Sequence, residues 1–330
     1  MTAGGGPLVS VITPFYNTAD YLAQCIESVL AQSYRHFEYI LLDNRSTDGS
    51  LDIAERYARQ DARIRVMTNT TFLEQDLNAS EGLHQAAAES RYCKVVLADD
   101  WIFPRCLEEL VAVAEAHPKV GVVGSYYLKG TTLMGGGLPY PSPRIDGRAL
   151  CRRHLLEGLF LFGSPTALLW RAEVVRARHP FYEGGRYHAD TEACYRTLKD
   201  WDFGFVHQVL SFLRTDNPSR MARVRDFGPS YLDKLIILTR FGPDFLSPTE
   251  LDQALRHQWH RYYELLGEAA LTLRPREFWD YHREGLATIG HRLAWYQPRL
   301  WLYTLLALAD AVLNPLKTAL RLRAHFFGRR

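Results

Sequence analysis

The sequence predicts an α/β fold: a mainly parallel sheet with helices on both faces, followed by a helical C-terminal extension. Apolar strand patterns alternate with amphipathic helix patterns over the first two thirds of the chain, which is typical of repeated βαβ units. Two of these strand patterns run directly into carboxylates, at Asp43 and at Asp99–Asp100. Since ligands bind at the carboxyl edge of such sheets, we expect a functional site there.

The first 130 residues alternate between the two patterns. Apolar runs predict strands at residues 8–13, 37–42, 64–68, 94–97 and 120–127. We expect helices between them, with starts at Asn17 or Thr18, after the Asn- and Gly-rich turn 44–49, at 78 (ending near 89) and after Pro104. Each of the first four strands is thus followed by a helix, as a parallel sheet requires.

The alternation then breaks. Residues 131–147 are dense in Gly and Pro and predict a mobile loop. Further strands are expected at 166–170, 203–206 and 209–213, and a helix is expected to start within 188–192. From Pro229 the pattern is helical almost to the end. We therefore predict an α/β domain over residues 1–215 and a helical region over 216–330.

Composition excludes several classes of protein. The 330 residues are 47% hydrophobic with a net charge of +2, which argues against disorder and against a general nucleic-acid binder. The five cysteines show no Cys-x-x-Cys spacing and are expected to be reduced thiols. Without a signal-peptide pattern or an apolar run of 18 residues, the protein is expected on the cytoplasmic side. No P-loop or Gly-x-Gly-x-x-Gly follows the first strand, against nucleoside triphosphatases and dinucleotide oxidoreductases.

The adjacent carboxylates of Asp99 and Asp100 are the strongest local signal. They follow a buried strand pattern and precede a helix that starts after Pro104. Hard oxygen ligands at such a point suit Mg²⁺ or Mn²⁺ that is also held by a substrate diphosphate. The alternative is that the two residues only cap backbone amides.

Four segments of the chain, taken together, are similar to family 2 of the inverting, nucleotide-sugar-dependent glycosyltransferases, which have the GT-A fold. The segments are VSVITPFYN at 9–17, DNRSTDGS at 43–50, LADD at 97–100 and the stretch 188–192. The similarity covers about residues 7–215. It implies a GT-A catalytic domain over 1–215, a nucleotide-sugar donor and a divalent metal, Mg or Mn.

The resemblance assigns donor-binding roles at the strand ends. It places Thr13, Pro14 and Tyr16 against the nucleobase, where the Tyr16 ring offers a stacking face. It gives Asp43 a hydrogen bond to the base. The alternatives are that Tyr16 is an ordinary loop aromatic and that Asp43 only forms a turn. Asp99 would contact the ribose or the metal, and Asp100 would be the principal metal ligand.

This sequence departs from the family pattern at three places. Asn44 stands where a second acid is usual, and Leu97 where a further Asp is common. Ala79–Ser80 replaces an Arg-Asn pair, so the cation expected near the donor phosphates is missing or comes from elsewhere. Arg45 and Arg91 are candidates for that cation.

Asp190 lies where the family has its catalytic base. Inverting transfer needs one carboxylate to take the proton of the acceptor hydroxyl. The alternatives are that Asp190 caps the following helix, or that Glu192 is the base. His188 is a candidate contact to the acceptor or to a diphosphate oxygen.

The C-terminal region combines aromatic and leucine-rich residues up to Leu313 with a basic tail from Lys317 to Arg330. This combination suits a helix lying in an anionic membrane interface. The alternatives are a helix packed on the catalytic domain or a homo-oligomer interface.

These observations predict an inverting glycosyltransferase that acts on a glycan or lipid-linked acceptor, in polysaccharide or glycoconjugate synthesis at the inner face of the cell membrane. A sugar nucleotidyltransferase is the alternative enzyme, although Pro14–Asn17 is not the Gly-rich basic loop typical of that class. A catalytically inactive nucleotide- or glycan-binding relative is the non-enzymatic alternative.

Overall fold

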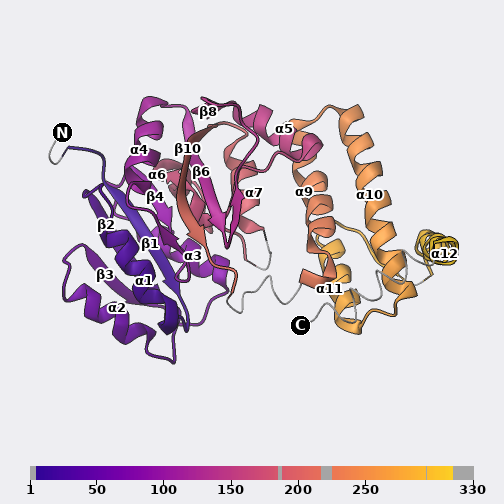
Figure 1. The fold of residues 1–330 in the computed structure, drawn as a ribbon, viewed down its shortest axis with the longest axis horizontal. Coiled ribbons are helices and arrows are strands. Elements are labelled where there is room, and N and C mark those ends of the chain that lie inside the picture. The colour runs from indigo at the N-terminus through magenta and orange to yellow at the C-terminus, as the bar shows by residue number, and fades with distance from the viewer. Residues whose placement is uncertain (1–4, 185–187, 217–224, 295, 315–330) are drawn as a thin grey trace. The chain divides into compact units, whose positions relative to one another are not determined.

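The computed structural model describes residues 5–184, 188–216, 225–294 and 296–314. The chain divides into two compact units, Met1–Ser219 and Arg220–Arg330. The first holds the sheet, and the second is helical (Figure 1).

One sheet organises the first unit, and its N-terminal half is parallel. In space the strands follow the order β3-β2-β1-β4-β9-β6-β10-β5. β1 pairs in parallel with both β2 and β4, and β2 pairs in parallel with β3. The bounds of these four strands are β1 Val9–Phe15, β2 Phe37–Asp43, β3 Ile64–Thr68 and β4 Tyr92–Val95.

The second half of the sheet is mixed. β9 is antiparallel to its neighbours β4 and β6, while β10 runs parallel to β6. Three short strands pair antiparallel at its periphery: β5 and β8 with β10, and β7 with β6. The bounds are β5 Trp101–Ile102, β6 Val120–Lys129, β7 Thr132–Met134, β8 Arg144–Ile145, β9 Leu169–Arg171 and β10 Asp202–Leu213.

Helices cover both faces of this sheet. Alternate residues of β1 point to opposite faces, so Val9 and Val11 join the core cluster formed with α1 and α4. Ile12 faces the other way, where a Cβ on Gly82 of α3 would come within 2.5 Å of it. The helix bounds are α1 Ala19–Leu30, α2 Ser50–Ala58, α3 Gln75–His84, α4 Cys106–Ala116, α5 Gly147–Glu157, 3₁₀ helix η1 Pro165–Ala167, α6 Ala172–Arg176 and α7 Ala189–Thr197.

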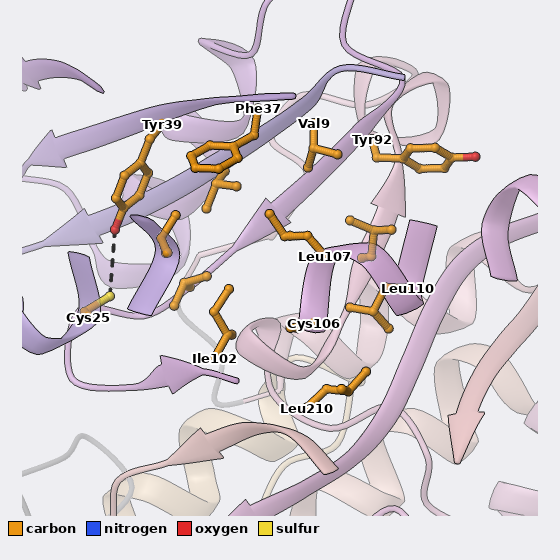
Figure 2. Packing of buried hydrophobic residues seen from close by; sticks show 14 of the residues in the cluster. Val9, Cys25, Phe37, Tyr39, Tyr92, Ile102, Cys106, Leu107, Leu110 and Leu210 are labelled. Atoms are coloured by element: carbon orange, nitrogen blue, oxygen red, sulfur yellow. Dashed lines mark hydrogen bonds between the residues drawn. The ribbon is translucent and has the colours of Figure 1, made fainter. Parts of the chain in front are cut away.

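The core cluster on the α1–α4 face is shown in Figure 2. Leu107 and Leu110 of α4 pack with strand residues such as Val9, and all three are fully buried. Burying such a side chain contributes about 1.5–3 kcal/mol. The Cys25 thiol lies 3.9 Å from the Tyr39 hydroxyl in the same cluster, so a small polar contact is enclosed there (Figure 2).

After residue 130, three sequence predictions needed correction. Residues 131–147 were predicted as a loop, but Gly130, at φ +56°, allows a tight turn from β6 into β7, and β8 follows. The predicted strand 166–170 is η1 followed by β9, because Pro165 favours a helical turn. The two late strands form one strand, β10, which passes the polar His207–Gln208 pair through irregular pairing.

The second unit is a helical cluster. Its buried core includes Leu235, Tyr262, Phe278 and Leu286. Within the described residues no helix is long and apolar enough to cross a membrane. The basic tail discussed above lies outside the described residues. The bounds are η2 Arg225–Phe227, α9 Pro229–Phe245, α10 Pro248–Leu271, α11 Arg276–Ala287 and α12 Pro298–Leu313.

Candidate active site

The strand ends that carry the predicted site residues meet at one edge of the sheet. Phe15, the last residue of β1, pairs with Asp43, the last residue of β2. On the other side, the Val96 amide donates to the Ile12 carbonyl of β1, and the chain then turns to Asp99 and Asp100. The fold therefore brings both predicted acidic positions to the carboxyl edge.

Asp100 is held firmly in a buried position. A turn closes between the Leu97 carbonyl and the Asp100 amide, and the Asp100 side chain is 4% exposed. Its two carboxylate oxygens have different donors: the Thr166 hydroxyl reaches Oδ2 at 2.6 Å, and the Arg214 backbone N–H reaches Oδ1 at 3.0 Å. Thus η1 and the end of β10 both orient this carboxylate.

The electrostatics of the acidic pair suit a cation. Burial, and next the charge of Asp99, raise the pKa of the Asp100 carboxyl well above its ordinary value. The described residues contain no group of three or more His, Cys, Asp or Glu that could hold a metal. Two carboxylates nevertheless fit Mg²⁺ or Mn²⁺, which keep several waters and take further oxygens from a bound phosphate.

Sequence reasoning missed Arg214, which follows β10 directly. Its Nε donates to the Asp99 carbonyl at 3.0 Å and its guanidinium to Gln24 of α1 at 2.8 Å. The guanidinium also lies 4.6 Å from the ring centroid of Tyr21 and 5.3 Å from that of Trp101. Arg214 therefore links the turn that carries Asp99 and Asp100 to α1. This link cannot be predicted from sequence spacing, because Arg214 is far along the chain from both partners.

Among the four residues predicted to contact the base, only Tyr16 presents an exposed side chain. It is 44% exposed, whereas Thr13, Pro14 and Asp43 are buried. The Thr13 hydroxyl lies 2.9 Å from the Tyr39 hydroxyl inside the core, and Asp43 accepts a hydrogen bond from the Ser46 amide at 2.9 Å. Their side chains are engaged within the protein.

A second aromatic residue, Phe72, accompanies Tyr16. The two rings meet edge to face with centroids 4.9 Å apart, and Phe72 is 59% exposed. Asn44 fixes the loop that carries Phe72: its side chain donates to the Leu73 carbonyl at 2.8 Å and accepts from the Leu73 amide at 2.9 Å. A carboxylate could not donate, which explains an amide at this position.

Asp190 and Glu192 occupy the first turn of α7 in different surroundings. Asp190 is half-buried and accepts from the Thr191 amide at 2.7 Å; burial raises the pKa of its carboxyl, and His188 opposes that shift. Glu192 is buried in an ion pair with Arg196 at 3.0 Å. The N-cap residue is His188, so Asp190 lies inside the helix.

η1 lies beside both Asp100 and Tyr127, a tyrosine whose hydroxyl is affected by the charge of Asp190. That charge raises the pKa of the Tyr127 hydroxyl, although burial is the larger cause, and Tyr127 packs against Ala167. Ala167 follows Thr166, the residue that binds Asp100. Of two adjacent residues of η1, Thr166 therefore binds Asp100, and Ala167 packs against a tyrosine whose pKa is affected by the charge of Asp190.

The two candidate replacements for the missing cation have different positions. Arg91 precedes β4 at the amino edge of the sheet, where it pairs with Glu115 at 3.1 Å. It is therefore remote from the carboxyl ends of the strands, where the acidic pair lies. Arg45 lies at the carboxyl edge and donates to the Thr70 carbonyl at 2.9 Å. Ser80 binds the backbone of Tyr182, which gives this position a structural role.

His257 and His260 are exposed on α10, and all five cysteines are free and buried. Trp101 stacks on Phe212 with ring centroids 3.8 Å apart, as an aromatic packing pair.

An α/β sheet of this topology, with an acidic pair at its carboxyl edge, is the arrangement expected of the GT-A fold. The family model for glycosyl transferase family 2 matches residues 10–172. EpsE of Bacillus subtilis, a protein named as a glycosyltransferase, is 44% identical over 214 residues, which are 60% of this chain and 75% of EpsE. EpsJ of the same organism is 34% identical over 260 residues, 78% of this chain and 68% of EpsJ. The chain belongs to glycosyltransferase family 2.

Solved structures share the fold. S. aureus TarS 1–349 in complex with UDP-GlcNAc matches with a TM-score of 0.61 and 18% identity, over 85% of this chain and 80% of that one. The mannosyltransferase PcManGT from Pyrobaculum calidifontis, in complex with GDP-Man and Mn²⁺, matches with a TM-score of 0.54 and 16% identity, over 94% and 88% of the two chains. The GT-A architecture extends to these distant sequences.

Proposed function

We infer that this glycosyltransferase moves a sugar from a nucleoside diphosphate to a glycan or lipid-linked acceptor, with inversion and with a divalent metal. The observation that carries the proposal is the buried Asp100 beside Asp99 at the carboxyl edge of the sheet. The complexes of two structural neighbours with UDP-GlcNAc and with GDP-Man and Mn²⁺ support this class of donor.

Each group has a chemical task in this proposal. Asp100, with Asp99, would hold Mg²⁺ or Mn²⁺, which supplies charge neutralisation for the departing diphosphate. Tyr16 would offer its ring to the base, with Phe72 beside it, and Thr13, Pro14 and Asp43 would shape the base site from within the protein. Asp190 would take the acceptor proton, and burial raises the pKa of its carboxyl, which is the direction that favours a general base.

The helical unit would hold the enzyme at the membrane. Apolar residues of α12 are widely exposed, among them Leu305 at 62% and Val312 at 70%. The sequence that follows is basic, so anionic lipid complements both features. Peripheral binding at the inner face of the membrane would place the active site near lipid-linked acceptors.

A donor assay tests the catalytic proposal. The full-length protein is incubated with a panel of UDP- and GDP-sugars, with and without Mn²⁺, and release of the nucleoside diphosphate is measured. We expect Mn²⁺-dependent release that Asp100→Asn abolishes while its circular dichroism stays unchanged. NMR of the transferred sugar should show an inverted anomeric centre, and retention would reject the inverting mechanism.

Two outcomes would favour the alternatives. Formation of a nucleoside triphosphate and sugar 1-phosphate from pyrophosphate and the nucleotide sugar would identify a nucleotidyltransferase. Nucleotide-sugar binding without any turnover would identify an inactive relative.

A further inference from the structure

A lysine lies buried behind the acidic pair. Lys94 is in the middle of β4, and its side chain is fully buried. Tyr92 and Val96, which share its face of the strand, belong to the apolar core cluster. Within the described part of the chain, no carboxylate lies at ion-pair distance from Nζ. A buried ammonium is costly, so a lysine at this position calls for a physical reason.

The ammonium binds the backbone of one short segment. Nζ donates to the Thr166 carbonyl at 2.5 Å and to the Leu168 carbonyl at 3.1 Å. These carbonyls lie in η1 and just beyond it, before β9 begins. Lys94 therefore fastens the C-terminal end of η1 to β4.

The residue held in this way is the one that orients Asp100. The Thr166 hydroxyl donates to Asp100 Oδ2 at 2.6 Å and accepts from the Leu97 amide at 3.1 Å. Thr166 is fully buried, so water does not compete for these bonds. Lys94 on the carbonyl and Asp100 on the hydroxyl form one hydrogen-bonded chain through Thr166.

We propose that Lys94 is a positioning residue for the metal site: it holds Thr166 so that the Thr166 hydroxyl fixes the Asp100 carboxylate. Each carboxylate oxygen accepts one hydrogen bond from the protein and keeps a further lone pair for a cation. Groups that orient a metal ligand in this way typically change metal affinity 10–100-fold when removed. The inference rests on the proposed function, because it takes Asp100 as the metal ligand.

Binding of Mn²⁺ tests the proposal without any turnover. Mn²⁺ affinity of the full chain is measured by electron paramagnetic resonance, with Mn²⁺ alone and with UDP or GDP added. We expect Lys94→Met and Thr166→Val each to lose about 10–100-fold in affinity. Thr166→Ser keeps the hydroxyl and should keep the affinity.

Two further variants separate positioning from a general structural role. Lys94→Gln can still donate one hydrogen bond and should retain more affinity than Lys94→Met; it also serves where the Met variant does not fold. The double variant Lys94→Met/Thr166→Val should lose no more than the larger single loss, since both changes break the same chain. Fully additive losses would overturn the proposal.

The sign of the Lys94→Met effect is itself diagnostic. An ammonium repels a metal ion, so tighter Mn²⁺ binding by Lys94→Met would show that charge repulsion dominates, and it would overturn the positioning role. Thermal unfolding measured in parallel should show variants that lose Mn²⁺ affinity at near-wild-type unfolding temperatures. If the variants lost Mn²⁺ affinity only in proportion to their loss of thermal stability, the positioning role of Lys94 would also be overturned.

Asp100→Asn distinguishes this inference from the proposed function. If Asp100→Asn abolishes Mn²⁺ binding while Lys94→Met and Thr166→Val bind like wild type, the metal site stands and the role of Lys94 falls. If the wild-type protein binds no Mn²⁺ with either nucleotide, the proposed metal site falls first, and this inference falls with it.

Discussion

At the scale of single residues, Asp190 and Glu192 are only two positions apart in the sequence, but their carboxylates have different surroundings. Glu192 is buried against Arg196, and this ion pair at 3.0 Å occupies lone pairs of the Glu192 carboxylate. Asp190 is half-buried, and burial raises the pKa of its carboxyl. Of the two, Asp190 is therefore better suited to exchange a proton with an acceptor.

Asp190→Asn should lower kcat on the order of 10²–10⁴-fold with little change in donor affinity. The amide keeps the shape of the side chain but cannot take a proton at neutral pH. Steady-state kinetics with donor and acceptor would measure this, alongside donor binding by calorimetry. Glu192→Gln is the matched control and should affect stability more than kcat. If Glu192→Gln lost activity while Asp190→Asn stayed active, Glu192 and not Asp190 would be assigned as the general base.

Phe72→Ala should weaken binding of a nucleoside diphosphate by about 2–10-fold, because an aromatic contact contributes about 0.5–1.5 kcal/mol beyond its buried area. Its ring supports Tyr16 and is itself exposed at the carboxyl edge. Calorimetric titration with UDP and GDP would measure the change. Leu273→Ala, at an exposed position in the helical unit, is the control. Unchanged affinity for both nucleotides would remove Phe72 from the base site.

At the scale of elements, a buried histidine joins three parts of the helical unit. His282 of α11 donates through Nε2 to the Phe227 carbonyl of η2 at 2.9 Å, and its Nδ1 lies 2.8 Å from the Tyr262 hydroxyl of α10. Since a carbonyl can only accept, the Tyr262 hydroxyl donates to Nδ1 in the neutral ring. Burial lowers the pKa of His282 to about 4, although the bond to Phe227 opposes the shift.

The helical unit should therefore lose stability as pH falls from about 6.5 towards 4. In that window the unfolded histidine binds a proton and the folded one does not, so acid favours unfolding. The contribution is roughly 3 kcal/mol at neutral pH, from about 1.4 kcal/mol per pKa unit. Urea unfolding of the full chain, with hydrogen exchange over α9–α11, would measure it. In the His282→Gln variant the free energy of unfolding should change less between pH 6.5 and 4. If it changed as steeply as in the wild type, His282 would not be the group responsible.

At the same scale, sequence patterns located most elements and misjudged several ends. Strand β3 was predicted at its observed bounds, because an apolar run with flanking turn residues leaves little choice. Helix α3 was predicted at 78–89 but spans Gln75–His84. The alanines after it favour a helix locally, yet the chain must turn there to enter β4.

At the scale of the whole molecule, α12 leaves an apolar face uncovered. Leu302, Leu305 and Val312 are each more than half exposed, which is unusual for a set of residues on one helix. Asp310 on the same helix makes deep insertion costly, so a shallow interfacial position suits it better.

Deletion of the residues after Gln297 should reduce sedimentation with anionic liposomes, and high salt should weaken binding of the intact protein. Leu305→Glu should act like the deletion because it places a charge on the apolar face. Leu273→Glu changes a leucine outside α12 that is even more exposed than Leu305, and this variant should bind as wild type. If the intact protein does not bind anionic liposomes even at low salt, the apolar face of α12 is an oligomer interface or packs against another part of the protein.

The sequence by itself determined the α/β class, the position of Asp43 and Asp100 at the carboxyl edge of the sheet, and the family. These follow from local patterns, because a buried strand that ends in a carboxylate must place it at the carboxyl edge of a parallel sheet. Only the tertiary structure decided which groups surround that carboxylate. Thr166 and Arg214 are 66 and 114 residues from Asp100 along the chain. They reach Asp100 because η1 and the end of β10 lie beside β4 and β5. Pairing between segments that are distant along the chain produces no periodic pattern in the sequence, so it could not be predicted from the sequence.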